Sequence, residues 1–255
     1  MLTGRRFTLP LQALEPVDLD GTGTATLALL NPTGGILGGD VLETSVDLGA
    51  GSHVCLITPS AARVYRSAGS PAVQRFRAVV GEGARLEYLP DHLIPSPGAR
   101  LHQATEVTLG AGATLLLADA WAVGRAARGE AWCFDELDLG LIVRDECGLV
   151  LKERCVLDRA RRDGLGGTEG LGYVATFVAV APFAGSWNDA ARTLFAALAA
   201  LGGGARFGVS ALGRGGVLAR VLCPSAPALE AARGAWWAAC RRLLLGLAPL
   251  PLRKL

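Results

Sequence analysis

Lysine is nearly absent from this 255-residue chain. Only Lys152 and Lys254 occur among the 25 basic residues, so arginine carries the positive charge, and the formal net charge is only +2. Nucleic-acid-binding proteins usually have a clear basic excess, and this chain has none. A P-loop requires a lysine directly after its glycine-rich turn, and neither lysine has that position. We therefore expect no nucleic-acid partner and no hydrolysis of nucleotides by a P-loop.

Histidine is equally scarce, and none of the three residues His53, His92 and His102 forms the i, i+4 pair that zinc or nickel sites favour. The motifs H-E-x-x-H and G-x-S-x-G do not occur. Six cysteines are scattered without a C-x-x-C pair, and most lie in apolar runs, so we expect reduced thiols in the core. The sequence thus predicts no fixed, high-affinity metal site and no permanently bound cofactor.

Long apolar runs are also missing. No segment offers the roughly 20 apolar residues that cross a bilayer, and the N-terminus lacks the apolar core of a signal peptide. A chain of 255 residues is long enough for one large domain. We expect a single cytoplasmic domain, residues 1–255, without a membrane partner. Its mean hydropathy of +0.36 favours a surface that a partner covers.

Glycine, in contrast, is abundant, with 34 residues, and it marks an internal repeat. The copies VDLGAGSHVCLIT, AVVGEGARLEYLP and VTLGAGATLLLAD (residues 46–58, 78–90 and 107–119) each join two β-rich runs through G-x-G. A degenerate fourth copy covers residues 141–158 and turns at residues 145–148. We interpret each copy as a hairpin with its turn at the glycines. Such a period predicts stacked units that bury their apolar faces on one another.

The C-terminal third has a helical pattern in two places. Ser186 is a predicted N-cap with Asp189 in capping-box position, and the helix after it would end at residues 202–204. A second helix is predicted from Pro227 to Leu247, with Arg241 off its apolar face. The first helix would bury Trp187, Leu194, Phe195, Leu198 and Leu201. Between the helices, residues 206–222 favour a hairpin.

The fold class is therefore mainly β: stacked β-hairpin or β-helical-like layers from about residue 20 to 180, with a helix-hairpin-helix region at about 186–247 packed on one side. Residues 61–77, rich in arginine, should cross between layers.

The decapeptide NPTGGILGGD, residues 31–40, is the most distinctive stretch. Gly34, Gly35, Gly38 and Gly39 allow the chain to fold back twice and to deliver Asp40 into the next strand. A turn of this kind points the Asp40 carboxylate inward in our interpretation.

Three carboxylates interrupt apolar strands: Asp40, Asp119 and Glu153. A buried carboxylate costs several kcal/mol unless it is paired, hydrogen-bonded or close to water. One explanation is an ion pair with an arginine, or a turn cap. The other is a shared, water-filled passage, in which oxygen ligands bind a divalent cation weakly enough to release it.

Four segments together resemble the urease accessory protein D family (UreD, also called UreH). They are NPTGGILGGD, TPSAARVYRS at 58–67, GARLEYLPDHLI at 83–94 and GRAARGEAW at 124–132, in this order. The resemblance implies a urease maturation chaperone without catalytic activity, with a fold of stacked strands and two helices. Such a scaffold would dock on urease apoprotein and, with accessory proteins F and G, pass nickel ions through an internal polar passage in nitrogen metabolism.

Position by position, the resemblance places Asp40, Asp119 and Glu153 in the nickel passage, with Ser60 and Glu130 as further candidates. Arg63, Tyr65 and Arg66 of the VYRS segment would be structural or interface residues. The C-terminal PLPLRKL differs from the family's Pro-Arg-aromatic ending.

The partner interface is predicted at Trp236, Trp237 and Arg241, because large exposed aromatic residues often anchor interfaces. The alternative is that both tryptophans pack on the β body. An alternative function follows from the repeat alone: a β-solenoid that binds carbohydrate or acts as a lyase. The row of exposed aromatic residues that such proteins use is not evident here.

Overall fold

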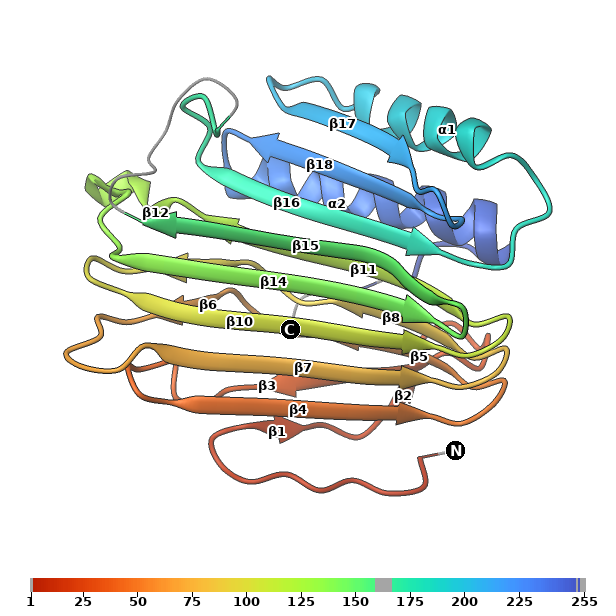
Figure 1. Cartoon of the computed structure of the whole chain (residues 1–255), viewed down its shortest axis with the longest axis horizontal. Helices are drawn as coiled ribbons and strands as arrows, with labels where there is room; N and C mark the ends of the chain where they lie inside the picture. The colour runs from red at the N-terminus through yellow and green to blue at the C-terminus, as the bar shows by residue number, and fades with distance from the viewer. Residues whose placement is uncertain (1, 159–166, 251, 253–255) are drawn as a thin grey trace.

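In the computed structural model, which describes residues 2–158, 167–250 and 252, two β-sheets lie face to face and two helices cover the far side of one of them (Figure 1). The long sheet has 11 strands with the main order β1-β3-β5-β8-β11-β16-β18-β17, and β2, β6 and β9 lie beside this path. The short sheet has five strands in the order β15-β14-β10-β7-β4. This architecture confirms the predicted fold class.

The strands of the long sheet are β1 (Gln12–Ala13), β2 (Val17–Asp18), β3 (Ala25–Leu30), β5 (His53–Ile57), β6 (Ala62–Val64), β8 (Arg85–Leu89), β9 (Leu93–Pro95), β11 (Thr114–Ala122), β16 (Tyr173–Val180), β17 (Arg206–Ala211) and β18 (Val217–Cys223). Those of the short sheet are β4 (Val41–Leu48), β7 (Ala72–Val80), β10 (Arg100–Leu109), β14 (Glu136–Asp145) and β15 (Gly148–Asp158). A small hairpin consists of β12 (Gly124–Arg125) and β13 (Glu130–Ala131), joined by a short helical turn, Ala126–Arg128.

The first three repeat copies are arches, not hairpins. The strands β4 and β5, which one G-x-G joins, do not pair: β4 pairs in parallel with β7, and β5 pairs in parallel with β8. Each copy therefore crosses from the short sheet to the long sheet, and successive copies stack in parallel, as in a β-solenoid. Only the fourth copy is a hairpin, because β14 and β15 pair in antiparallel fashion around the turn at residues 145–148.

Glycine is required in the arches for two reasons. The second glycine of each pair, such as Gly83 with φ of 62°, has a left-handed backbone. The first glycine of the second copy, Gly81, touches the arch before it, so that a Cβ there would lie 2.6 Å from the Leu48 carbonyl oxygen. Gly81 N–H also donates to this oxygen at 2.9 Å. The arches are thus held together by main-chain contacts.

Residues 61–77 cross between the sheets as predicted, since β6 belongs to the long sheet and β7 to the short one. The hairpin predicted at residues 206–222 is confirmed by the antiparallel pair β17 and β18.

Helix α1 (Trp187–Ala199) begins after Ser186, whose Oγ accepts a hydrogen bond from the Asp189 N–H, which confirms the predicted cap. Leu194 and Leu198 are buried, but Phe195 is 47% exposed and Leu201 is 42% exposed, so the buried face is narrower than the sequence predicted. Helix α2 (Ala226–Cys240) has Ser225 as its N-cap and continues into a π-helical turn, Arg241–Leu245.

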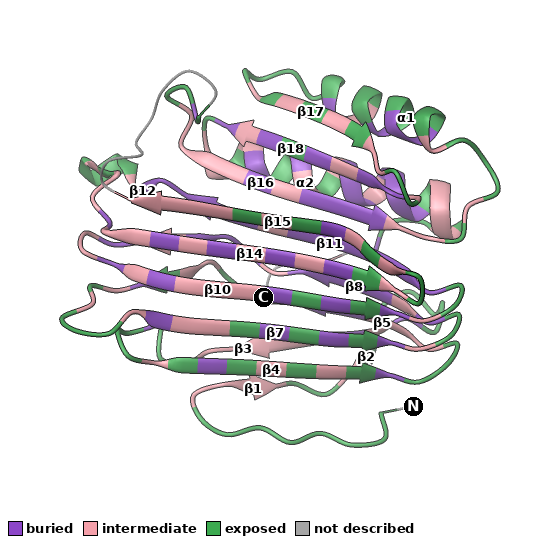
Figure 2. Ribbon diagram, viewed as in Figure 1, coloured by how far each residue is buried: buried purple, intermediate pink, exposed green. Residues whose placement is uncertain are grey.

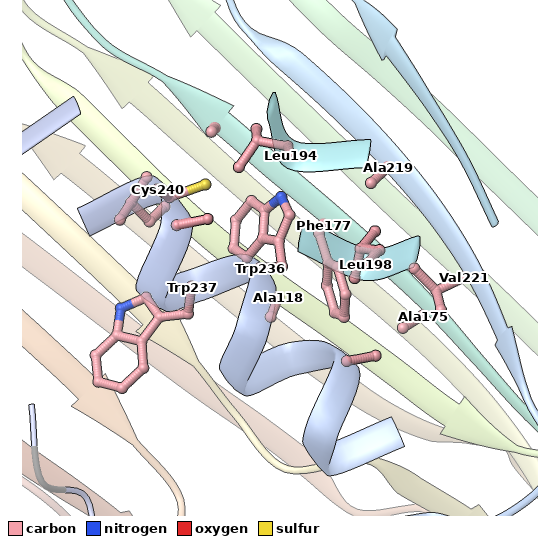
Figure 3. Packing of buried hydrophobic residues seen from close by; sticks show 14 of the residues in the cluster. Ala118, Ala175, Phe177, Leu194, Leu198, Ala219, Val221, Trp236, Trp237 and Cys240 are labelled. Carbon is pink, nitrogen blue, oxygen red and sulfur yellow. The ribbon is translucent and has the colours of Figure 1, made fainter. Parts of the chain in front are cut away.

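The core between the helices and the long sheet contains the predicted interface residues. Trp236 is fully buried and stacks on Phe177 with ring centroids 5.0 Å apart (Figure 3). Trp237 and Arg241 are also buried, so all three are unavailable for contact with a partner at the surface. The alternative, that the tryptophans pack on the β body, is confirmed. Arg241 was predicted at the surface because it lies off the apolar face of the helix. It is buried because Glu87 neutralises its charge inside the protein, and the position of a residue on a helix does not reveal such a partner.

All six cysteines are free thiols, but only three of them lie in the core, where the sequence predicted most of them. Cys55, Cys223 and Cys240 are buried, whereas Cys147 is exposed in the β14–β15 turn and Cys133 and Cys155 are half-buried. Among the described residues, no helix combines the length and the apolar character that a membrane span needs.

The outer face of the short sheet has no helix over it, and exposed residues alternate with buried ones along its strands (Figure 2). This alternation has the period of two expected where one face of a sheet meets the core.

Candidate functional site: a polar cavity between the sheets

A cavity of about 150 Å³ lies between the two sheets. The decapeptide forms part of its wall through Gly34, Gly35 and Ile36. Strands β7, β10 and β11 contribute Gln74, Gln103 and Asp119. The cavity separates two apolar clusters of the inter-sheet core, one containing Phe76 and Tyr88 and the other containing Ile36 and Leu93.

Two glutamines and an aspartate form a polar group inside this cavity. Gln74 and Gln103 are direct neighbours on β7 and β10. From the facing sheet, Asp119 accepts a hydrogen bond from Gln103 Nε2 at 3.2 Å. The side-chain oxygens Oε1 of Gln74 and Gln103 are buried, and within the described residues neither has a hydrogen-bond partner. Buried acceptors of this kind are normally satisfied by water or by a bound ion.

The electrostatics of the cavity are dominated by Asp119. Burial raises the pKa of Asp119 to about 6, although hydrogen bonds from Gln103 and from the Ala120 backbone oppose this shift. Burial, with the Asp119 charge as a second cause, raises the pKa of Tyr88. At neutral pH the cavity therefore holds one carboxylate next to two neutral amide oxygens and a protonated phenol. Oxygen ligands of this kind suit a divalent cation that keeps part of its water shell.

Asp40 does not line this cavity. Its Oδ2 accepts a hydrogen bond from the Leu37 N–H at 2.8 Å, and the Asp40 N–H donates to the Leu37 carbonyl at 3.0 Å, so it caps its own turn. The predicted double turn is present, with φ of 77° at Gly34 and 88° at Gly39. The decapeptide thus supplies the wall of the cavity, while its carboxylate closes the turn.

The other predicted acids also have partners outside the cavity. Glu153 forms an ion pair with Arg220 across the two sheets, and Glu130 accepts from Arg125 Nε at 2.5 Å within the β12–β13 hairpin. Of the further candidates, exposed Ser60 lines the cavity. In the VYRS segment, Tyr65 Oη donates to the Gly34 carbonyl at 3.4 Å, which gives it a structural role, while Arg63 and Arg66 are exposed.

Gln74 and Gln103 were not predicted from the sequence, although a signal for them exists. Along β7 and β10 alternate residues face the core, and each glutamine occupies such a position in an otherwise apolar or threonine-containing series. A search for polar residues at buried positions of the two-residue period would have found both.

A buried charge cluster on the helix side of the long sheet was not predicted either. Glu87, 1% exposed, lies 2.7 Å from His53 Nε2 and 3.3 Å from Arg241 Nη1, and it accepts a hydrogen bond from Trp237 Nε1. Arg241 is fully buried, and its three guanidinium nitrogens donate no hydrogen bond within the described part of the chain. The charges of Glu87 and Arg241 neutralise each other there.

A chain of polar side chains leads from this cluster to the surface. His53 Nδ1 lies 3.1 Å from Thr24 Oγ1, which lies 2.9 Å from Thr22 Oγ1. Thr22 donates to Asp20 Oδ1 at 2.6 Å, and Asp20 Oδ2 is 3.8 Å from Arg241 Nη2. The described residues contain no group of three or more His, Cys, Asp or Glu side chains that could bind a metal ion. The members of the cluster are paired with one another, so we interpret it as a structural feature.

Comparisons with a family model and with related proteins all point to the same family. The model of the UreD urease accessory protein family matches residues 1–254. A urease accessory protein UreD from Deinococcus radiodurans is 37% identical over 96% of this chain and 86% of its own length. Proteins of the same description from Mycolicibacterium gilvum and Cupriavidus pinatubonensis are 35% and 32% identical, covering 94% and 99% of this chain and 86% and 88% of their own lengths.

Proposed function

Because the chain belongs to the UreD family of urease accessory proteins, we propose that it is a non-catalytic scaffold that passes nickel ions to urease apoprotein through the cavity between its sheets. The observation that supports this most directly is the group of Asp119, Gln74 and Gln103, where one carboxylate faces two buried oxygens that have no hydrogen-bond partner among the described residues.

The chemistry of this group suits transfer better than storage. One carboxylate and two amide oxygens bind a borderline divalent cation weakly, because they offer neither imidazole nor thiolate. A weakly bound ion can leave again, which a passage requires. Nickel is then a transient cargo of the protein, and Ser60 contributes a hydroxyl group at the exposed part of the cavity.

Asp40, Glu130 and Glu153 stay predictions for parts of the passage outside this cavity. Accessory proteins F and G, together with urease apoprotein in the cytoplasm, are the proposed partners. Their binding surfaces must lie elsewhere than at the buried residues Trp236, Trp237 and Arg241.

The test removes the negative charge of Asp119 and keeps the shape of its side chain. Asp119→Asn, co-expressed with urease apoprotein and accessory proteins F and G, should lower the nickel content of purified urease by about tenfold, the lower limit of what the loss of a group near a metal usually costs. Gln103→Leu should act in the same direction. Nickel is measured by mass spectrometry of the urease, and assembly by co-purification.

The matched control is Asp138→Asn. Asp138 is paired with Arg154 through Oδ1 at 2.8 Å, and both residues belong to the short sheet, away from the cavity lining. This variant should load urease with nickel as well as the wild type does. If Asp119→Asn assembled normally and gave fully loaded urease, the role of the cavity would be refuted. If the wild-type chain bound neither urease apoprotein nor proteins F and G, the scaffold function itself would be refuted.

A further inference from the structure

The strand β4 ends the short sheet, and its outer edge carries free backbone groups. On its inner side, the Asp40 and Leu48 carbonyls accept hydrogen bonds from the Val73 and Gly81 N–H groups at 2.8 and 2.9 Å. Hydrogen-bonding direction alternates along a strand. The odd-numbered residues of β4 therefore direct their N–H and C=O groups away from β7, and within the described residues no backbone group bonds to them.

A groove of about 670 Å³, lined by both polar and apolar residues, runs beside this edge, between β4 and residues 6–13. Three large apolar residues near it are unusually exposed: Leu9 at 75%, Val41 at 58% and Phe7 at 47%. No backbone hydrogen bond joins residues 6–13 to β4 in the described structure, so this segment borders the edge without satisfying it.

The charges on β4 indicate what the edge can accept. Glu43 and Asp47 project from the outer face of the strand, both at odd-numbered, exposed positions. Glu43 is bonded to Arg75 at 2.8 Å, whereas Asp47 stands beside Val79 and has no charged partner among the described residues. Two copies of this chain paired through β4 would gather four carboxylates on one face, which is unfavourable.

We propose that the edge of β4 is a docking site for an extended segment of a partner protein in which lysine or arginine alternates with apolar residues. The segment adds a sixth strand to the short sheet. Its backbone satisfies Val41, Glu43 and Ser45 on β4, its apolar side chains enter the groove, and its basic side chains lie next to Asp47. Addition of a strand to an exposed edge is an established mode of peptide recognition.

The experiment uses the full-length chain and two fluorescent eight-residue peptides, one alternating lysine with valine and one alternating glutamate with valine. The lysine peptide should bind more tightly than the glutamate peptide, because its basic side chains attract Asp47 and those of the glutamate peptide repel it. We expect a difference of about tenfold, which corresponds to about 1.4 kcal/mol. Ser45→Pro removes one free N–H at a position where an edge strand tolerates proline, and it should weaken binding of the lysine peptide by about tenfold. Ser45→Ala, which retains the N–H, is the matched control and should bind as the wild type does.

Two further measurements keep the proposal testable if Ser45→Pro folds poorly. Asp47→Lys should reverse the preference between the two peptides. In hydrogen exchange of the wild-type chain, the lysine peptide should protect the amides of Val41, Glu43 and Ser45, while those of Leu42 and Thr44 stay unchanged. Equal binding of both peptides, no effect of Asp47→Lys, or protection elsewhere in the chain would each overturn the proposal.

Discussion

Single polar residues at core-facing positions create the cavity in which we propose that an ion binds. Gln74, Gln103 and Asp119 each replace an apolar residue within a strand, and together they produce a polar cavity between two apolar clusters. Asp119 was one of three acids that the sequence predicted for such a cavity because they interrupt apolar runs, and Asp40 and Glu153 do not line it. The two amide neighbours of Asp119 could not be assigned to it, since they come from strands that only the fold brings opposite to β11.

The pKa of Asp119 makes a stability prediction. Folding raises this pKa from 3.8 to about 6 by burial, so the folded state favours the protonated carboxyl group. Below pH 4 the carboxyl group is protonated in the folded and in the unfolded state, so the free energy of unfolding is unaffected. Between pH 4 and 6 only the unfolded state loses the proton, and the free energy of unfolding falls by up to roughly 3 kcal/mol. Asp119→Asn, which has no charge, should therefore gain stability relative to the wild type as the pH rises from 4.5 to 7.5.

Urea unfolding at these two pH values measures the difference. Asp138→Asn is again the control. The salt bridge with Arg154 lowers the pKa of Asp138, so its removal should not stabilise the protein at the higher pH. A difference between wild type and Asp119→Asn that is the same at both pH values would contradict the raised pKa.

At the scale of elements, the same glycine pattern can produce two different connections. The G-x-G signal correctly placed the turns of the first three copies, but it predicted hairpins where these copies form arches. A left-handed glycine suits both connections, and the sequence does not say whether two joined strands pair with each other or with their copies in the next repeat. The choice is made by the inter-sheet core, because residues such as Phe76 and Tyr88 from facing sheets stack with centroids 3.8 Å apart.

The arches give a prediction with an internal control. Gly81→Ala should destabilise the protein by about 1–3 kcal/mol, the usual cost of forced overpacking, because the new Cβ would meet the Leu48 carbonyl oxygen at 2.6 Å. Gly49 is the equivalent residue of the first copy, and a Cβ added there would have no neighbour within 4 Å, so Gly49→Ala should be tolerated. Thermal unfolding of the two variants distinguishes the cases. Equal melting temperatures would show that the arches do not depend on this close approach.

At the scale of the whole molecule, the buried charge cluster joins parts of the chain that are far apart in sequence. Asp20 precedes β3, Glu87 lies on β8, and Arg241 follows helix α2. The helices and strands themselves were largely predictable from periodicity and caps. Their attachment through a buried arginine was not, because Arg241 and the exposed Arg242 are indistinguishable in the sequence.

This attachment predicts a large difference between two adjacent arginines. Arg241→Met leaves the Glu87 carboxylate buried without its cation, and we expect a loss of about 3 kcal/mol, as for other broken buried pairs. Arg242→Met changes an exposed side chain and should cost less than about 0.5 kcal/mol. Denaturant unfolding measures both. A loss of similar size in the two variants would show that the ion pair with Glu87 does not stabilise the fold.

The close approach of the decapeptide to the VYRS segment has a consequence for the width of the cavity. A Cβ on Gly35 would lie 2.6 Å from the Arg63 carbonyl oxygen, and the Ile36 N–H donates to that same oxygen at 2.7 Å. The Cε2 atom of the Tyr65 ring would lie even closer to that Cβ, at 2.5 Å. At this wall the width of the cavity is therefore limited by the main chain and by the Tyr65 ring, both packed against glycine. A side chain added at Gly35 would have to displace these atoms, whereas an exchange at Gln74 or Gln103 would change the polarity of the lining.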